Sequence, residues 1–233
     1  LEMAEPETVR RYHERTAAAL RRRYARAIES HAFRIARHLE LAKRKDEARE
    51  YYVRAARYAG RIYANGRGIE AYLKALDLSE DGRDKREIAE ELGELYTRVA
   101  EYPVALECFS LARSLTESAA GDSDSPSGTG QLDLLDKIGG VLHRQGELAE
   151  AISVFSRCLE QSTDRLEDKA RALFRIGGIH LDRGDALAAI QYLERSLKTY
   201  EQLGNHRQMA AAQAELGIAE KNLDEGNWKG ALS

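Results

Sequence analysis

The chain has 233 residues, of which 43% are hydrophobic and 32% charged, with only three prolines and four phenylalanines. Its abundant Ala, Leu, Glu and Arg residues favour helices and disfavour a sheet protein. No apolar run approaches the roughly 18 residues that a bilayer requires, so the sequence predicts no membrane span. Two cysteines are too few for a disulfide framework, and we therefore expect a cytoplasmic protein.

The net charge of −3 hides an asymmetry along the chain. Residues 1–61 hold 16 Lys and Arg against 9 Asp and Glu, whereas the remaining residues hold 20 against 30. The arginines of the basic end fall on several helix faces, which favours a solvated surface over one docking surface. The alternative is a surface for nucleic acid, an acidic domain or a membrane, and we rank nucleic acid and membrane below a protein partner.

Residues 6–27 have apolar side chains at helical spacing, and Pro6 suits a first helical turn. Residues 1–29 are thus predicted to contain an N-terminal helix that serves as a cap or connector. Helices over 30–42 and 47–58 then predict a hairpin. Asn65-Gly66 indicates a turn. Only 20 residues separate Ala48 from Gly68, so a second hairpin with a stunted first helix is expected, giving degenerate hairpins over 30–78.

Residues 79–233 contain one pattern three times, beginning at Leu92-Gly93, Ile138-Gly139 and Ile176-Gly177. In each, an Ala follows the glycine after 12 residues, a large apolar residue after 4 more and a small one after another 3. A glycine inside a helix costs about 1 kcal/mol relative to alanine, so the matched glycines, with Gly217, predict close helix packing. Further glycines are expected in left-handed helix caps, namely Gly146, Gly184 and Gly226.

Residues 117–130 are rich in Ser, Gly and Asp without apolar periodicity, which predicts a flexible loop. A last repeat is expected to begin at Leu216-Gly217, to turn at residues 226–228 and to stop just after Ala231. Because a terminal repeat needs a complete capping helix, we expect this repeat to be incomplete and the natural protein to continue.

The spacing of small and large residues resembles the tetratricopeptide repeat, and the resemblance is strongest over residues 86–204. It implies an all-α, right-handed solenoid of helix-turn-helix repeats. Stacked hairpins of this kind usually bind a partner and rarely catalyse a reaction, so the resemblance implies a non-catalytic binding module.

A second resemblance covers residues 34–40, 46–56 and 62–78, which are similar to the start of the repeat region in STAND-class signal-transducing ATPases. In that class the array senses an inducer or partner and holds the ATPase inactive. The resemblance therefore implies a sensor segment of a larger signalling protein. The alternative is a free-standing adaptor of the co-chaperone kind. It would lack a carboxylate clamp, because Glu90, Glu94 and Asp136 stand where that clamp has Lys or Asn.

No residue pattern in the sequence predicts catalysis, a metal or a cofactor. His13, His31 and His38 do not form the His-Glu-x-x-His pattern of zinc sites. Residues 122–126 resemble a calcium loop only until Pro126 interrupts it. Cys108 and Cys158 occupy small packed positions and are expected to behave as small hydrophobic residues.

In the tetratricopeptide family the first helices line a concave groove, and this resemblance implies binding residues here. They are Glu87, Glu90, Glu94, Arg98, Asp133, Asp136, His143, Arg144, Arg171, Phe174 and Leu181. Five are carboxylates, which would form either a solvated acidic face or a site for a basic segment with an apolar anchor. The expected partner is a protein or peptide, another domain of the same polypeptide, or a small-molecule inducer. The basic N-terminal region could also bind in trans and cause self-association.

Overall fold

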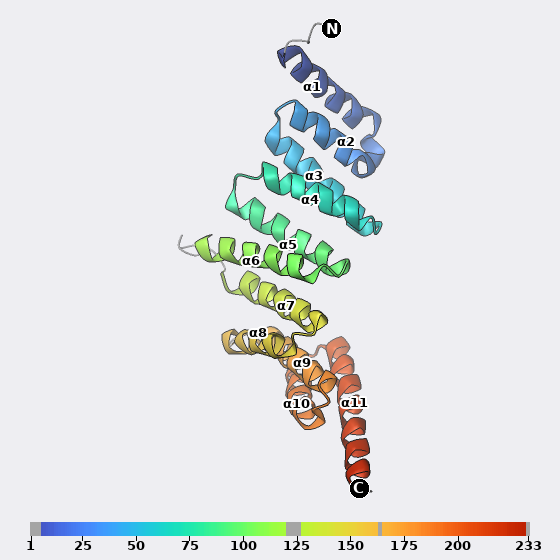
Figure 1. Ribbon diagram of the computed structural model, residues 1–233, viewed down its shortest axis with the longest axis vertical. Helices are drawn as coiled ribbons and strands as arrows, with labels where there is room; N and C mark the ends of the chain where they lie inside the picture. Colours follow the sequence, from blue (N-terminus) through green and yellow to red (C-terminus); the bar gives the residue numbers. More distant parts are fainter. Residues whose placement is uncertain (1–5, 120–126, 163–164, 232–233) are drawn as a thin grey trace. The chain divides into compact units, whose positions relative to one another are not determined.

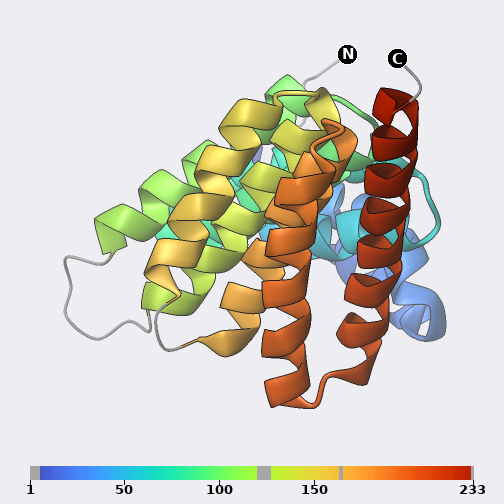
Figure 2. The ribbon, with the colours of Figure 1, turned by 90° about the horizontal axis from the view of Figure 1, so that it is seen from below.

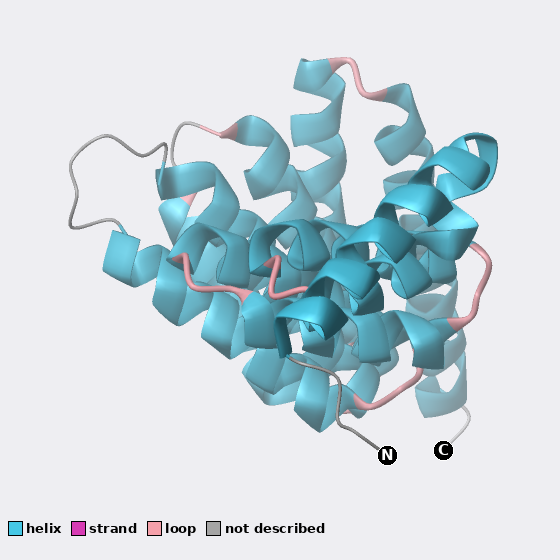
Figure 3. Ribbon diagram, turned by 90° about the horizontal axis from the view of Figure 1, so that it is seen from above, coloured by secondary structure: helices cyan, strands magenta, loops and turns pink. Residues whose placement is uncertain are grey.

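The computed structural model describes residues 6–119, 127–162 and 165–231. These residues are almost entirely helical and contain no strand (Figures 1 and 3). Contacts divide the chain into two compact units, residues 1–125 and 126–233. In each unit, consecutive helices pack side by side as hairpins. The predicted fold class, an all-α array of helix-turn-helix repeats, is therefore confirmed.

The first unit consists of six α-helices and one turn of 3₁₀ helix among its described residues. They are α1 (Pro6–Arg23), η1 (Ala25–Ala27), α2 (Ile28–Leu41), α3 (Lys45–Arg61), α4 (Asn65–Leu78), α5 (Gly82–Arg98) and α6 (Tyr102–Ala119). The one helix expected at the N-terminus thus stops at Arg23, and η1 turns the chain so that α1 packs on α2. Buried side chains of α1 to α5 form a continuous core that includes Ile35, Tyr52, Tyr72 and Leu92.

The second unit contains five helices among its described residues. They are α7 (Ser127–Gln145), α8 (Leu148–Gln161), α9 (Leu166–Asp182), α10 (Ala186–Leu203) and α11 (His206–Ala231). Figure 2 shows α10 and α11 side by side, and the contacts agree with this view. Their shared core includes Ala189 and Leu193 of α10 and Ala219 of α11.

The matched glycines make space for a large side chain of the second helix in each regular hairpin. A Cβ placed on Gly93 would lie 2.8 Å from the Phe109 ring, and one on Gly139 would lie 2.6 Å from the Phe155 ring. Gly177 has the same relation to Leu193, at 2.7 Å. Such distances are shorter than real carbon–carbon contacts, so only glycine permits this packing. The predicted packing role of these three glycines is confirmed.

One tight turn recurs at six connections between helices in the part of the chain that the structure describes. A backbone N–H bonds to the carbonyl five residues earlier, as from Arg44 to Leu39 and from Ala64 to Ala59. The residue before that N–H has a positive φ, which is the left-handed helix cap known as the Schellman motif. The cap positions are Lys43, Tyr63, Ala100, Gly146, Gly184 and Gly204. The caps predicted at Gly146 and Gly184 are thus confirmed.

Helix α3 belongs to two hairpins at once, and this corrects the expected stunted helix. The 12, 4 and 3 spacing runs from Ala36 on α2 to Ala48 and Tyr52 on α3, and again from Ala56 on α3 to Gly68 and Tyr72 on α4. A single 17-residue helix therefore serves as the second helix of one hairpin and the first helix of the next. The turn comes before Asn65-Gly66, because the cap residue is Tyr63.

Three further expectations are wrong in part. The loop predicted over 117–130 is shorter, because α6 continues to Ala119 and α7 begins at Ser127, while residues 120–126 lie outside the described residues. A Cβ placed on Gly217 would meet no atom of a neighbouring helix within 4 Å among the described residues, so this glycine has no packing role of the predicted kind. The turn predicted at 226–228 is absent, since α11 continues to Ala231. The surrounding Ala, Glu, Lys and Leu residues favour helix strongly enough to offset the glycine cost of about 1 kcal/mol.

Among the described residues, no helix combines the length and apolar character that a membrane crossing requires.

Two adjacent glycines of α7 allow a matched test of the packing role. We expect Gly139→Ala to lower the free energy of unfolding by about 1–3 kcal/mol, because the new Cβ overlaps the Phe155 ring. Gly140→Ala should instead raise it by about 0.5–1 kcal/mol, because among the described residues no atom outside the adjoining helix backbone lies within 4 Å of its Cβ position. Urea unfolding of the two variants measures both effects. Equal effects would contradict the packing argument.

Candidate functional site

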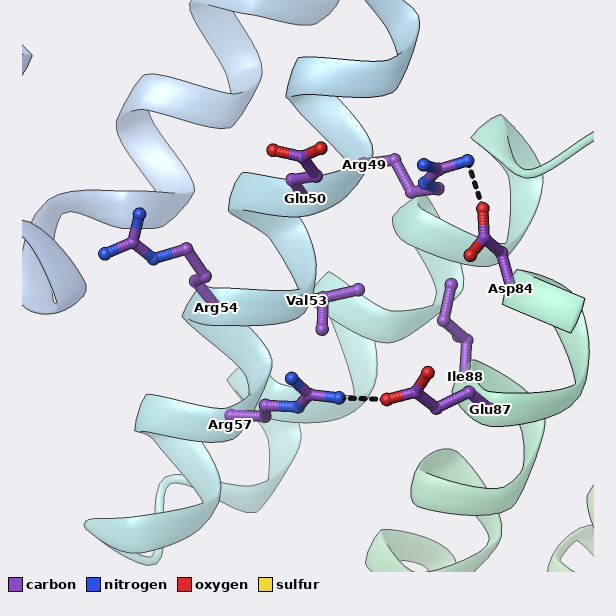
Figure 4. Close-up of a pocket in the computed structure, with 8 residues that line it drawn as sticks. All are labelled: Arg49, Glu50, Val53, Arg54, Arg57, Asp84, Glu87 and Ile88. Carbon is purple, nitrogen blue, oxygen red and sulfur yellow. Dashed lines mark hydrogen bonds and ion pairs between the residues drawn. The ribbon is translucent and has the colours of Figure 1, made fainter.

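Two adjoining hollows lie between α3 and α5 in the first unit. The Arg49 hollow has a volume of about 380 Å³ and is lined by Arg49, Glu50, Val53, Arg54, Arg57, Asp84, Glu87 and Ile88 (Figure 4). The Arg98 hollow has a volume of about 410 Å³ and is lined by Ala56, Arg57, Gly60, Arg61, Tyr63, Tyr72, Glu91, Glu94, Leu95 and Arg98. Arg57 lines both, so the hollows form one groove along the two helices.

Arginines of α3 face carboxylates of α5 across this groove. Arg49 lies 2.5 Å from Asp84, and Arg57 lies 2.6 Å from Glu87, as the dashed lines in Figure 4 mark. Arg57 also forms an ion pair with Glu91. Hydrogen bonding to Glu91 is the main cause that raises the pKa of Arg57. The carboxylates of α5 are therefore partly neutralised by the neighbouring first helix.

Tyr72 of α4 contacts this network of ion pairs through Glu91. Its side chain is buried, and its hydroxyl donates a hydrogen bond to Glu91. Burial, followed by the bond to Glu91, raises the pKa of the Tyr72 phenol still further above neutral pH. The tyrosine thereby holds the Glu91 carboxylate in position for Arg57.

Arg98 makes a different contact at the other end of the groove. Its guanidinium donates to the carbonyl of Gly60 at 3.2 Å, near the C-terminal end of α3. A cation is favoured there because the last carbonyls of a helix carry partial negative charge.

The second unit has a similar ion-pair row between its first helices, α7 and α9. Arg171 lies 2.9 Å from Asp133 of α7 and 2.6 Å from Asp168 of its own helix, and Arg175 lies 3.3 Å from Asp136 of α7. Burial opposes the charge of Arg171, but Asp136, Asp168 and Asp133 outweigh burial and raise its pKa. In this unit the carboxylates of α7 are bound by arginines of α9.

The predicted binding residues thus have different surroundings. On α5, Glu87, Glu94 and Arg98 line the groove, whereas Glu90 lines neither hollow and lies 4.0 Å from Arg86 of its own helix. In the second unit, Asp133, Asp136 and Arg171 come together.

Among the other predicted residues of the second unit, His143 pairs with Asp182 at 2.6 Å, and Arg144 is exposed. Phe174 and Leu181 pack against the core shared by α10 and α11, so part of the predicted apolar anchor site is already covered. The residues on α5 and those on α7 and α9 belong to separate units.

The arginines of α3 that line the groove were not predicted from the sequence, because residues 47–58 were interpreted only as the second helix of a hairpin. Arg49, Arg54 and Arg57 lie on α3, which is also the first helix of the next hairpin. The repeated 12, 4 and 3 spacing from Ala56 to Gly68 was the signal that could have placed them.

Histidines and cysteines have packing roles. The Nδ1 atoms of His13 and His38 lie 2.8 Å apart between α1 and α2, and the His180 ring stacks on Tyr192 with centroids 5.5 Å apart. Cys158 is buried and Cys108 partly buried, and neither forms a disulfide. Within the described residues, no group of three or more potential ligands could hold a metal ion.

Comparison with known proteins agrees with the hairpin architecture. Residues 130–202 match the family described as tetratricopeptide repeat. No curated protein matches the chain.

Several solved structures resemble the chain. The apo form of RapI does so with 18% identity and a TM-score of 0.68, over 85% of this chain and 56% of RapI. A Rap protein complexed with Competence and Sporulation Factor has 19% identity and a TM-score of 0.58, over 85% of this chain and 56% of that one. MamA has 18% identity and a TM-score of 0.58, over 87% of this chain and 96% of MamA. The chain thus spans about half the length of the Rap structures, and at these identities the likeness shows the fold alone.

The support that Tyr72 gives to Glu91 can be measured by removing one oxygen. We expect Tyr72→Phe to lower the free energy of unfolding by about 1–2 kcal/mol, because a buried hydrogen bond to a charged group is lost. Tyr200→Phe is the control, since Tyr200 is equally buried and its hydroxyl makes no hydrogen bond within the described residues. It should change stability by less than about 0.5 kcal/mol. A similar loss in both variants would show that the bond to Glu91 contributes little.

The cysteines offer a second measurement. Burial raises the pKa of Cys108 to about 11 and that of Cys158 to about 12. At about pH 8, roughly one thiol in a thousand or fewer is then a thiolate, so both should react slowly with iodoacetamide in the native protein. In concentrated guanidinium chloride both should react at the rate of a free cysteine. Fast native labelling at Cys158 would mean that the core around it opens readily.

Proposed function

We propose that this chain is a helical-repeat scaffold that binds an extended peptide or protein segment in the groove between α3 and α5, and that it is not an enzyme. The observation that carries the proposal is the pair of adjoining hollows of about 380 and 410 Å³, lined by charged side chains of two first helices. A groove of this kind offers charged groups together with apolar side chains, here Val53, Ile88 and Leu95, among its lining residues.

The structural neighbours support a peptide partner. The Rap protein cited above was solved in complex with Competence and Sporulation Factor, so a protein of this fold binds that factor. Transfer of that property to this chain is part of the proposal, because the shared identity is only 19%. A bound segment would lie against the arginines of α3 and the carboxylates of α5.

A finer proposal concerns the protein context. We infer that the chain is the sensor segment of a larger signalling protein, as its resemblance to the repeat region of STAND-class ATPases implies. The groove would then hold either an inducer peptide or a segment of another domain of the same polypeptide. Binding of the one would displace the other, which is how a repeat array can report the arrival of a signal.

The groove proposal can be tested by filling the Arg49 hollow. Glu50 lines that hollow, is exposed and has no ion pair with any described residue, so Glu50→Trp adds bulk without breaking a contact. We expect peptides selected from a random display library against the wild-type chain to bind this variant about tenfold more weakly or worse, a loss of about 1.4 kcal/mol. Fluorescence anisotropy with the selected peptides measures the change.

The matched control is Glu194→Trp, which places the same side chain on an exposed position of α10 in the second unit. This variant should bind the selected peptides as the wild type does. If Glu50→Trp and the wild type bind them equally, the groove between α3 and α5 is not the binding site. If the library yields no binding peptide, the proposal of a peptide scaffold fails.

A further inference from the structure

The Arg98 hollow combines two features that helix packing does not require. One is the conformation and exposure of Tyr63, and the other is the incomplete bonding of Arg98. Both residues line the same hollow, from the turn after α3 and from the end of α5 respectively.

Tyr63 occupies the left-handed cap position of the turn between α3 and α4, with a φ of 59°. A bulky side chain is strained in this region, and glycine is the residue that adopts it freely. The equivalent turns of the second unit carry Gly146 and Gly184, and the turn after α5 carries Ala100. Tyr63 is also 83% exposed, so its ring gains almost no packing within the described residues. The fold therefore gives no reason for an aromatic residue here.

The Arg98 side chain lies against the C-terminal end of α3, where a glycine leaves room for the guanidinium. Gly60 is buried, and a Cβ there would lie 3.3 Å from the Arg98 guanidinium. A larger residue would thus push the guanidinium away from the carbonyl that it contacts. This contact uses one N–H of the five that an arginine carries.

The other cations of the hollow already have carboxylate partners. Arg57 binds Glu87 and Glu91, and Arg61 binds Glu29. Within the described part of the chain, Arg98 has no carboxylate within ion-pair distance. The remaining N–H groups of Arg98 are therefore available to an anion that enters the hollow.

We propose that the Arg98 hollow binds an acidic side chain of an extended peptide. Arg98 is the anion-binding residue, and the ring of Tyr63 packs on an apolar residue of the peptide next to the acidic one. Guanidinium and carboxylate can form two parallel hydrogen bonds, which makes the pairing strong and specific. The exposed ring of Tyr63 and the side chain of Leu95 provide the apolar surface next to it. This proposal rests on the proposed function and specifies the chemistry of its ligand.

The test uses a library of acetylated and amidated octapeptides, in which Asp, Asn, Lys or Leu is fixed at one position at a time. We expect the wild-type chain to prefer Asp over Asn about tenfold at one position, equivalent to about 1.4 kcal/mol. Arg98→Gln should abolish this preference, whereas Arg67→Gln, which removes an exposed arginine of α4 that lines neither hollow, should leave it unchanged. A preference for Lys, or a preference for Asp that survives in Arg98→Gln, would overturn the proposal.

Tyr63 is tested with a glycine that relieves the strained φ. Tyr63→Gly should raise the melting temperature by about 2–4 °C and yet weaken binding of the Asp-containing peptides about threefold or more. Ala100→Gly makes the same change in the turn after α5 and should raise the melting temperature without altering binding. Unchanged binding by Tyr63→Gly would overturn the role of the ring.

The two proposals fail separately in these experiments. If Glu50→Trp weakens peptide binding but Arg98→Gln and Tyr63→Gly do not, the groove binds peptides without the carboxylate chemistry proposed here. If peptides with a free C-terminus bind and the amidated ones do not, the anion is the chain terminus and the assignment to an acidic side chain is wrong.

Discussion

The close approach of two helices over a single glycine is the contact on which the regular hairpins depend. In each, a ring or a branched side chain of the second helix occupies the volume that a Cβ of the first helix would fill, as Phe109 does over Gly93. Because the helices lie so close, a short turn with one left-handed residue suffices to connect them. The hairpins then present their first helices to one another, and the groove between α3 and α5 is a result of that order.

Charge complementarity between neighbouring first helices is the second organising interaction. In the first unit the arginines lie on the earlier helix, as Arg57 does opposite Glu91, whereas in the second unit they lie on the later helix, as Arg171 does opposite Asp133. Exposed pairs of this kind each contribute little to stability, typically about 0–1 kcal/mol. In the proposed binding role their larger effect would be on recognition, since a ligand would have to compete with, or add to, charges that already have partners.

The hairpins from α5 to α10 could be predicted from the sequence, because their packing leaves a local pattern of small and large residues. The double role of α3 was missed because its anchors, such as Tyr52 and Ala56, interleave on one helix and match two templates. The sequence predicted a turn at Gly226, but a lone glycine costs too little to end a helix, and α11 continues through it. The ion pairs of the groove join residues 30 or more positions apart, and no local pattern reports them.

The shared helix also has a consequence for how the first unit unfolds. In an array of separate repeats, total stability is close to a sum of repeat and interface contributions, and one end can fray while the other stays folded. Helix α3 supplies half of two hairpins, so unfolding of α3 removes one helix from each of them. Residues 28–78 should therefore exchange their amide hydrogens as a single foldon. Because α3 forms one side of the groove, the affinity of a ligand bound there would depend on the folding of α2, α3 and α4 together.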